Sequence, residues 1–231
     1  MSAVRLLSDG FFGIDKGFLV YRKASYYGVP YMAALKPLLV IVDGERMLVD
    51  TGIGELPPRI KRFYEIERER TLERNLREEG LKPGDITIVI NTHLHLDHCG
   101  NNALFKNAKF YVQRDELRYA YSPDRFQKNT YVRELFDAVD YVTVKGDHEV
   151  SESVRIISTP GESPGHQSVI VDAEDERYIY CGDASPLREN LERRNVPGTL
   201  YNPVQALESI DRLRGIQGIH IFSHDRDQLS L

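Results

Sequence analysis

The sequence predicts an α+β fold made of two similar halves, each with strands first and helices later. Short apolar and β-branched runs recur along the chain, and segments with helical spacing of apolar residues follow them in each half. No linker or low-complexity segment interrupts the 231 residues, of which 41% are hydrophobic and 28% charged. We therefore expect a single domain over residues 1–231, although its halves share no obvious sequence repeat.

Residues 1–50 are expected to form a series of strands. Residues 38–42 and most of residues 47–50 are apolar, and Asp43-Gly44 between them is a strong signal for a tight turn, so these segments predict a β-hairpin. Residues 18–21 form a further short apolar run. The aromatic loop of residues 26–32 has two interpretations, surface packing or one wall of a ligand pocket.

The segment from Arg59 to Glu79 is densely charged and has apolar residues at helical spacing. We expect a helix there, ended by Gly80 and Pro83, with its charges on a solvated face. Residues 86–90 then predict a buried strand, because all of them are β-branched and most are apolar.

The rest of the chain alternates between predicted strands and helices. Residues 202–214 form the best-defined helix, with Asn202 as its N-cap, a proline in its first turn and Gly215 after its end. Helices are also expected at residues 101–105, 114–121 and part of 124–138. Strands are predicted at residues 109–112, 141–144, 154–158, 168–172, 178–181 and 219–222.

Composition argues against several classes of protein. The net charge of −5, without a basic block, disfavours a nucleic-acid-binding protein. No stretch approaches the roughly 20 apolar residues of a membrane span, and no signal peptide is evident. The two cysteines, Cys99 and Cys181, imply no disulfide framework and fit a reducing compartment. We expect a cytoplasmic protein without a nucleic-acid or membrane partner.

Residues 91–100 concentrate side chains that bind metals. Three of the seven histidines fall within six residues and enclose an aspartate, giving His93, His95, Asp97 and His98. An H-x-H-x-D-H pattern arises by chance in about one of a few thousand chains of this composition. Because the pattern follows the strand predicted at 86–90, it stands where a rigid strand gives way to a loop. The first two histidines can leave the same side of an extended segment, whereas the adjacent Asp97 and His98 must point differently, which suits a second ion.

Three further strand ends carry ligand-type residues, namely His166, Asp183 and His224. Imidazole and carboxylate donors suit zinc and also iron, manganese or cobalt. Five histidines and two aspartates are too many for one tetrahedral structural zinc, but they fit two ions about 3.5–4 Å apart. One carboxylate must then bridge the ions, and Asp183 is the natural candidate.

The remaining candidates are less specific. His148 is expected to be exposed in a turn, and His220 lies within a predicted strand. Asp50 follows a predicted strand and precedes glycines. Two interpretations of it stay open, because it can cap a turn or its carboxylate can support a metal-binding imidazole.

This constellation resembles the metallo-β-lactamase superfamily in its dinuclear hydrolase form. The motifs that carry the resemblance are H-x-H-x-D-H at 93–98, Gly165-His166, Gly182-Asp183, Ser223-His224 and the upstream segment 48–52. The resemblance implies a four-layer αββα sandwich with two metals at one edge between the sheets. It also implies that His93, His95 and His166 bind the first metal. Asp97, His98 and His224 would bind the second, and Asp183 would bridge the two.

Within the superfamily, roughly residues 35–225 look like the N-acyl homoserine lactonases, which are quorum-quenching enzymes. The cues are residues 92–101, 112–114, 163–168, 182–185, 188–190 and 222–225. One position departs from this family, whose members usually carry a tyrosine just after Asp-Ala-Ser, because Pro186 stands there. A substitute tyrosine would have to reach the substrate, and the candidates are Tyr26, Tyr27, Tyr121 and Tyr201; otherwise the metal acts alone.

The resemblance implies a hydrolase that opens the lactone ring of N-acyl homoserine lactones or cleaves a related lactone or ester. Its cofactors would be two divalent cations, Zn²⁺ first and Mn, Fe or Co as alternatives. Asp97 is expected to be catalytic as well as a ligand, because its free oxygen can orient the attacking water and pass a proton to the leaving group. The partner is a small-molecule substrate, and a homodimer through residues 57–80 and 26–32 stays open.

Two alternative functions use the same metals. One is a phosphodiesterase or nuclease, which the acidic charge disfavours, and the other is a glyoxalase II-like thioesterase, which would be expected to carry a C-terminal helical domain. A dioxygenase with one iron would need fewer ligands. A non-catalytic metal-binding protein is disfavoured because every expected ligand is present.

Overall fold

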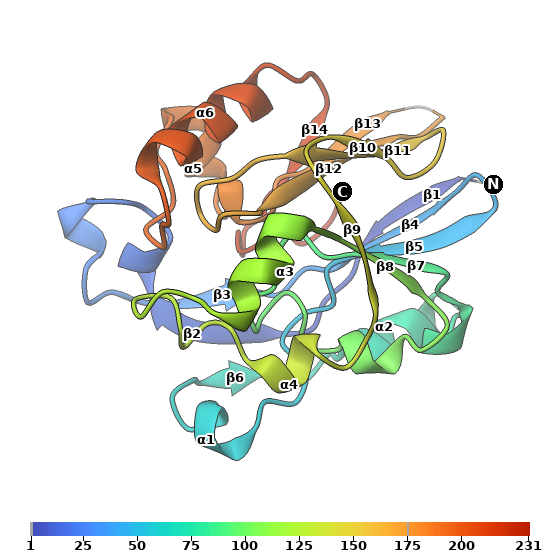
Figure 1. Cartoon of the computed structure of the whole chain (residues 1–231), viewed down its shortest axis with the longest axis horizontal. Coiled ribbons are helices and arrows are strands. Elements are labelled where there is room, and N and C mark those ends of the chain that lie inside the picture. Colours follow the sequence, from blue (N-terminus) through green and yellow to red (C-terminus); the bar gives the residue numbers. More distant parts are fainter. Residues whose placement is uncertain (1, 175) are drawn as a thin grey trace.

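The computed structural model describes residues 2–174 and 176–231. Two β-sheets stack face to face and helices cover their outer faces, so the layers follow the order αββα (Figure 1). This arrangement confirms the predicted fold class. Within the described residues, no helix combines the length and the apolarity needed to cross a membrane.

The first sheet has the order β1-β4-β5-β7-β8-β9. Its strands are β1 (Ala3–Leu6), β4 (Leu38–Val42), β5 (Glu45–Val49), β7 (Ile88–Ile90), β8 (Lys109–Gln113) and β9 (Tyr141–Val144). β4 and β5 form the predicted hairpin, and both turn residues have a left-handed backbone, with φ of 53° at Asp43 and 78° at Gly44. β5, β7, β8 and β9 run parallel, so their carboxyl ends meet at one edge of the sheet.

The second sheet has the order β10-β11-β12-β13-β14. Its strands are β10 (His148–Glu149), β11 (Val154–Ser158), β12 (Gln167–Asp172), β13 (Arg177–Tyr180) and β14 (Ile219–Ile221). β13 and β14 are parallel, so the loops that follow them leave from the same edge. A small third sheet joins β2 (Phe11–Asp15) to β3 (Pro30–Ala34) and β6 (Ile66–Glu67).

Alternation along the strands explains the layers, because successive side chains of a strand face opposite sides. In β4, Val40 packs with Val169 of the other sheet in the core between them. Its neighbour Leu39 points outward and packs with Leu76 of a covering helix. The helices are α1 (Pro58–Lys61), α2 (Leu72–Glu78), α3 (Arg114–Tyr121), α4 (Arg133–Phe136), α5 (Arg188–Arg193) and α6 (Pro203–Arg214).

The prediction of one helix from Arg59 to Glu79 is wrong. α1 and α2 are separate, and β6 lies between them. The apolar side chains serve two different clusters, since Ile60 packs near the small sheet whereas Leu76 packs under the first sheet. One straight helix could not reach both. Arg68 holds the intervening chain by donating to the backbone carbonyl of Gly54 at 3.0 Å.

Several boundaries near the N-terminus also differ from the predictions. Residues 18–21 are not a strand, because a 3₁₀ helix spans Lys16–Phe18 and a turn follows. β3 begins at Pro30, inside the segment expected to be a loop. The strands β2 and β3 are half-exposed at many positions, which weakens the apolar alternation that would reveal them. His148 lies in β10 and is partly buried rather than exposed in a turn.

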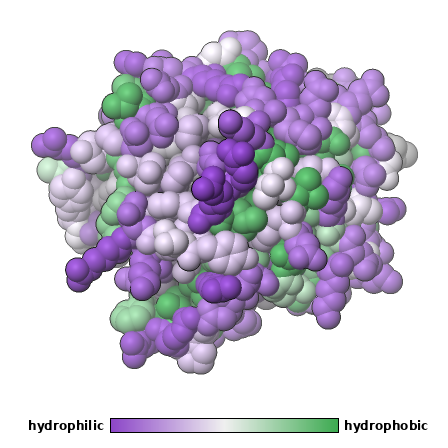
Figure 2. Space-filling model, in the orientation of Figure 1, coloured by the Kyte–Doolittle hydropathy of each residue, from purple (hydrophilic) through white to green (hydrophobic). Residues whose placement is uncertain are grey.

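The other predicted elements are found close to their expected positions. α3 and β9 have the predicted bounds, and Asn202 caps α6 by accepting hydrogen bonds from the amides of Val204 and Gln205. The helix expected at 101–105 is a short 3₁₀ helix, Asn102–Leu104. On the face shown in Figure 2, hydrophilic residues predominate and apolar ones form small scattered groups.

Candidate metal centre

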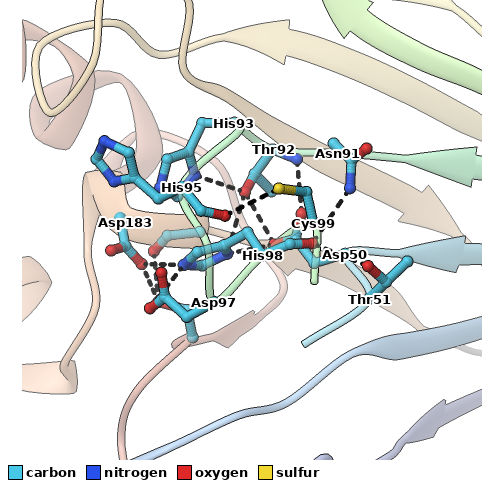
Figure 3. Close-up of polar contacts among 12 residues, drawn as sticks. Asp50, Thr51, Asn91, Thr92, His93, His95, Asp97, His98, Cys99 and Asp183 are labelled. Atoms are coloured by element: carbon cyan, nitrogen blue, oxygen red, sulfur yellow. Dashed lines mark hydrogen bonds and ion pairs between the residues drawn. The ribbon is translucent and has the colours of Figure 1, made fainter. Parts of the chain in front are cut away.

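Four loops bring all seven predicted ligands to one edge of the sandwich. His93, His95, Asp97 and His98 follow β7, and His166 lies directly before β12. Asp183 follows β13 and His224 follows β14. Figure 3 shows the loop after β7 facing the carboxylate of Asp183. The parallel strands therefore deliver donors from both sheets to one place, as the sequence predicts.

One group of donors surrounds two carboxylates. The Oδ1 atom of Asp183 lies 3.3 Å from Nε2 of His98 and 3.2 Å from Nε2 of His224. The Oδ2 atom of Asp97 lies 3.6 Å and 3.3 Å from the same two nitrogens. Asp97, His98 and His224 offer ligand atoms within 4.8 Å of one another. This is the set expected at the second metal.

A second group is centred on His93. Its ring centroid lies 4.4 Å from that of His95 and 5.2 Å from that of His166. The ligand atoms of His93, His98 and Asp183 also lie within 4.8 Å of one another. Asp183 therefore stands between the two groups, which is where a bridging carboxylate would be needed.

The protein fixes the orientation of the imidazole rings from behind. Nδ1 of His224 lies 2.9 Å from the backbone carbonyl of Ala34, and Nδ1 of His166 lies 3.1 Å from that of Thr159. A carbonyl can only accept, so each of these Nδ1 atoms carries the proton. Nε2 of each ring therefore faces the cluster, on the side where a metal ion would be bound.

Asp50 supports a metal-type imidazole, which is one of the two interpretations left open by the sequence. Its Oδ2 atom lies 2.8 Å from Nδ1 of His98, and its carboxylate also accepts hydrogen bonds from the amide and hydroxyl of Thr92 (Figure 3). The residue is buried and has a left-handed backbone with φ of 59°. The carboxylate thus fixes the His98 ring with Nε2 directed at Asp183 and Asp97.

The pKa values of the clustered imidazoles are shifted in opposite directions. Burial lowers the pKa of His98, but the carboxylates of Asp183 and Asp97 outweigh it and raise the pKa well above its usual value. Burial opposes protonation of His224 too, yet Asp183 and its neighbours raise that pKa to about 10. Burial and the neighbouring imidazole of His98 hold the pKa of His93 well below its usual value. A divalent cation would displace the protons of His98 and His224.

Several buried atoms in the cluster lack a hydrogen-bond partner among the described residues. They are Nε2 of His93, His95 and His98 and both carboxylate oxygens of Glu162. The carboxylate of Glu162 lies close to Nε2 of His93 and to Nδ1 of His95, whereas Nε2 of His95 is not the atom that faces it. Buried polar atoms are normally satisfied, so unsatisfied atoms this close together indicate a missing partner. Lone pairs of imidazole and carboxylate are the donors that divalent transition metals prefer. The residues present therefore fit a metal centre.

A protein-family model matches residues 38–219, and its description is "Metallo-beta-lactamase superfamily". The chain belongs to this superfamily. An N-acyl homoserine lactonase of Bacillus thuringiensis is 32% identical over 198 residues, which cover 79% of this chain and 77% of that protein. An N-acyl homoserine lactonase of Rhizobium radiobacter is 34% identical over 165 residues, which cover 64% of this chain and 61% of that protein.

Solved structures agree with the family assignment. The structure of an N-acyl homoserine lactone hydrolase with the product N-hexanoyl-L-homoserine bound at its catalytic metal center matches with a TM-score of 0.85. The match covers 97% of this chain and 94% of that chain at 28% sequence identity. As a member of the superfamily, the chain is a metal-dependent hydrolase that uses divalent metals.

The glycine of the superfamily motif Gly182-Asp183 has a clear physical reason in this chain. Gly182 has φ of 56°, and a Cβ atom there would lie 2.6 Å from Nε2 of His166. A side chain at this position would occupy the space in which the imidazole presents its lone pair. The amide of Asp183 donates to that same nitrogen at 2.9 Å. The loop is thus held close against the His166 ring.

A cavity of about 380 Å³ lies beside the donors. Its polar side consists of His95, Asp97, Glu162, Asp183 and His224. Much of the remaining lining is apolar and includes Phe12, Ile14, Phe18, Leu19, Phe126 and Leu200. Phe18 and Phe126 are 59% and 66% exposed, which places them toward solvent. An apolar cavity with a few polar groups at one end is typical of a small-molecule site.

The expectation about the tyrosine needs correction. Tyr26, Tyr27, Tyr121 and Tyr201 do not line the cavity, whereas Tyr64 does. Pro186, which follows the predicted bridging residue Asp183, lines the same cavity. Tyr121 instead donates a 2.5 Å hydrogen bond to Asp137. The aromatic 26–32 loop borders a separate shallow hollow that Tyr64 shares. Among the described residues, Tyr64 is therefore the tyrosine placed to meet a substrate.

Sequence reasoning missed Glu162. This residue lies in the Pro- and Gly-rich loop Thr159–His166, in which only the histidine was singled out. Its side chain is 1% exposed and shares a ligand group with His93 and His95. The available signal was an acidic residue four positions before a predicted ligand in a loop that is otherwise uncharged.

Proposed function

We propose that this hydrolase opens the ring of N-acyl homoserine lactones or of a closely related lactone or ester. The observation that carries the proposal is the shape of the cavity, which joins a metal-type donor cluster to an apolar wall. Metal ions held by the donor cluster would bind the lactone carbonyl, and the apolar side chains would pack against an acyl chain. The lactonases of B. thuringiensis and R. radiobacter support the same substrate class.

The cofactors in this proposal are two Zn²⁺ ions, with Mn, Fe or Co as alternatives. His93, His95 and His166 would hold the first ion, and Asp97, His98 and His224 would hold the second. Asp183 would bind both, which its position between the two donor groups supports. When bound, the two cations lower the pKa of a water molecule and polarise a carbonyl oxygen.

The side chains of the cavity have separate tasks in this reaction. Asp97 is 11% exposed and borders the cavity, so its carboxylate can orient the attacking water and pass its proton to the leaving alkoxide. Tyr64 can donate its hydroxyl proton to the carbonyl oxygen in place of the tyrosine that Pro186 replaces. The apolar wall holds the acyl chain and excludes water from the reacting end.

Proton release tests the proposal directly. Purified protein loaded with Zn²⁺ is expected to release one proton per N-hexanoyl homoserine lactone hydrolysed, and a chelator should abolish the reaction. The D183N variant should lose it too, because the proposed bridging carboxylate is gone. Hydrolysis of a bis(p-nitrophenyl) phosphate without turnover of any lactone would instead establish the phosphodiesterase alternative.

Three broader expectations remain part of the proposal. We place all 231 residues in one domain, since strands from both halves share the core between the sheets. A cytoplasmic location is supported by Cys99 and Cys181, which are both buried and unpaired. A homodimer is supported by the exposed rings of Tyr27 and Phe63, and light scattering would test it.

A further inference from the structure

Glu162 is a buried carboxylate that no proposed role has yet used. It lies in the loop between β11 and β12, four residues before His166, and is 1% exposed. Neither carboxylate oxygen makes a hydrogen bond of good geometry among the described residues, and the polar atoms close to the carboxylate are imidazole nitrogens of His95 and His93. Leaving such a group buried and unsatisfied is costly, so the fold must provide it with a partner of another kind.

The position of the carboxylate identifies that partner. Oε1 of Glu162 lies 3.1 Å from Nδ1 of His95, and Oε2 lies 3.7 Å from Nε2 of His93. Two donor atoms that share one metal ion at bonds of about 2.0–2.2 Å are roughly 3–3.6 Å apart. In the other donor group, Asp97 Oδ2 lies 3.3 Å from His224 and 3.6 Å from His98. The distances from the Glu162 carboxylate to His93 and His95 are therefore similar to those from the Asp97 carboxylate to His98 and His224.

The surrounding loop keeps the Glu162 side chain in this place. The backbone carbonyl of Glu162 accepts a hydrogen bond from Nε2 of Gln127 at 2.8 Å. On the other side, the hydroxyl of Ser163 donates to Glu116 at 2.6 Å. The loop is therefore fixed on both sides of Glu162, and its carboxylate can approach the histidines without a rearrangement of the backbone.

Glu116 provides an internal comparison. It is a fully buried acid close to the same loop, and its two oxygens accept four hydrogen bonds. The donors are the amides of Leu94 and Gly165 and the hydroxyls of Tyr131 and Ser163. The fold thus satisfies one buried glutamate completely with its own donors. It leaves the other, directed at the metal-type nitrogens, without any.

We propose that Glu162 is a further ligand of the first cation, so that the centre has eight protein ligands instead of seven. The inference rests on the proposed function, because it takes the two-cation assignment as given. A second carboxylate beside three imidazoles would raise the coordination number of that ion above the four that tetrahedral zinc prefers. It would therefore shift the preference of the first site toward manganese, iron or cobalt.

The test measures metal binding rather than turnover. Metal-free protein is titrated with Zn²⁺ or Co²⁺ against a chromophoric chelator, for the wild type and for E162Q, E162D and E65Q. E162Q is expected to bind one of the two ions at least about 10-fold more weakly and the other as the wild type does. E162D should also lose affinity, because it keeps the charge but withdraws the carboxylate. E65Q removes an exposed acid away from the donors and should match the wild type.

The Co²⁺ spectrum supplies a second readout, and the wild-type spectrum on its own does not depend on the folding of any variant. Wild-type protein is expected to show the weak visible bands of a five- or six-coordinate ion at its first site, and E162Q the stronger bands of lower coordination. Wild-type affinities and an unchanged spectrum in E162Q would overturn the inference and leave Glu162 as a substrate-facing carboxylate. Strong tetrahedral bands from both ions of the wild type would overturn it as well.

These measurements distinguish a failure of the Glu162 assignment from a failure of the proposed function. If the wild type binds two cations but opens no lactone, the proposed substrate fails while the affinities still decide the role of Glu162. If lactones are hydrolysed and E162Q binds both ions as the wild type does, the proposed function is supported and Glu162 is not a metal ligand.

Discussion

Asp50 determines how His98 presents its ring to the cluster, because its carboxylate takes the Nδ1 side at 2.8 Å. In D50N the size is kept, but the charge is lost and one oxygen acceptor becomes an amide donor. We expect D50N to bind one cation about 10- to 100-fold more weakly, measured by chelator competition. Asp227 is exposed in the C-terminal segment, so D227N is the matched control and should bind as the wild type does. Equal affinities for D50N would contradict the supporting role.

Tyr64 allows a second prediction at the level of one residue. Burial and, to a smaller extent, Asp97 raise the pKa of its phenol, so it keeps its proton at neutral pH and can act as a donor. Y64F is expected to lower kcat/KM for the lactone on the order of 100-fold without changing the metal content. Y27F removes an exposed hydroxyl outside the cavity and should have no effect. Full activity in Y64F would mean that the cations work without a tyrosine.

At the scale of elements, Asp9 connects segments that are far apart in the chain. Its fully buried carboxylate accepts five hydrogen bonds, with donors at Ile53, Gly54, Arg68, Leu72 and Asn101. These donors come from the loop after β5, the segment after β6, the start of α2 and the loop that carries His93, His95 and His98. The Asp9 side chain therefore links the loop after β5, which contains Asp50, to the loop after β7, which contains His93, His95 and His98.

Replacing Asp9 should destabilise the whole fold. D9N leaves the guanidinium of Arg68, whose side chain is 16% exposed, without its buried partner at 2.9 Å. We expect a loss of about 3–5 kcal/mol in the free energy of unfolding, measured by urea denaturation of the metal-free protein. Glu55 is the other partner of Arg68 and is 78% exposed, so E55Q should cost about 1 kcal/mol or less. Similar losses in the two variants would show that Asp9 has no special role.

The elements also show what the sequence can and cannot predict. His93, His166, Asp183 and His224 were predictable because each follows or precedes a strand that local composition reveals. Glu162 and Asp9 were not, since their importance comes from partners distant in sequence. The split of residues 59–79 into two helices was missed for the same reason. Helical spacing cannot show that neighbouring apolar side chains belong to different cores.

At the scale of the whole molecule, Lys36 fastens the C-terminal segment to the connection between β3 and β4. Its Nζ atom donates to the backbone carbonyls of Asp225 and Gln228, both at 2.8 Å. The residue is 4% exposed, and burial lowers the pKa of its ammonium group from 10.5 to about 7. The unfolded chain therefore binds more protons than the folded one between about pH 7 and 10.5.

Stability should rise with pH across that window, because the folded state prefers the neutral amine. Between pH 7 and 9 we expect the wild type to gain about 2 kcal/mol or less relative to K36M, which has no titrating group at this position. Urea denaturation at a series of pH values measures the difference. Parallel stability curves for the two proteins would show that Lys36 stays charged when folded.

The donors of the metal centre come from four loops on both halves of the chain, and no half carries a complete set. A compact molten state could keep the far-ultraviolet circular dichroism of both sheets while the loops drift apart by a few ångströms. Such a preparation would lose its ions before it lost its spectrum. The ratio of metal to protein after gel filtration therefore serves as a quality control of native tertiary order, independent of any knowledge of the substrate.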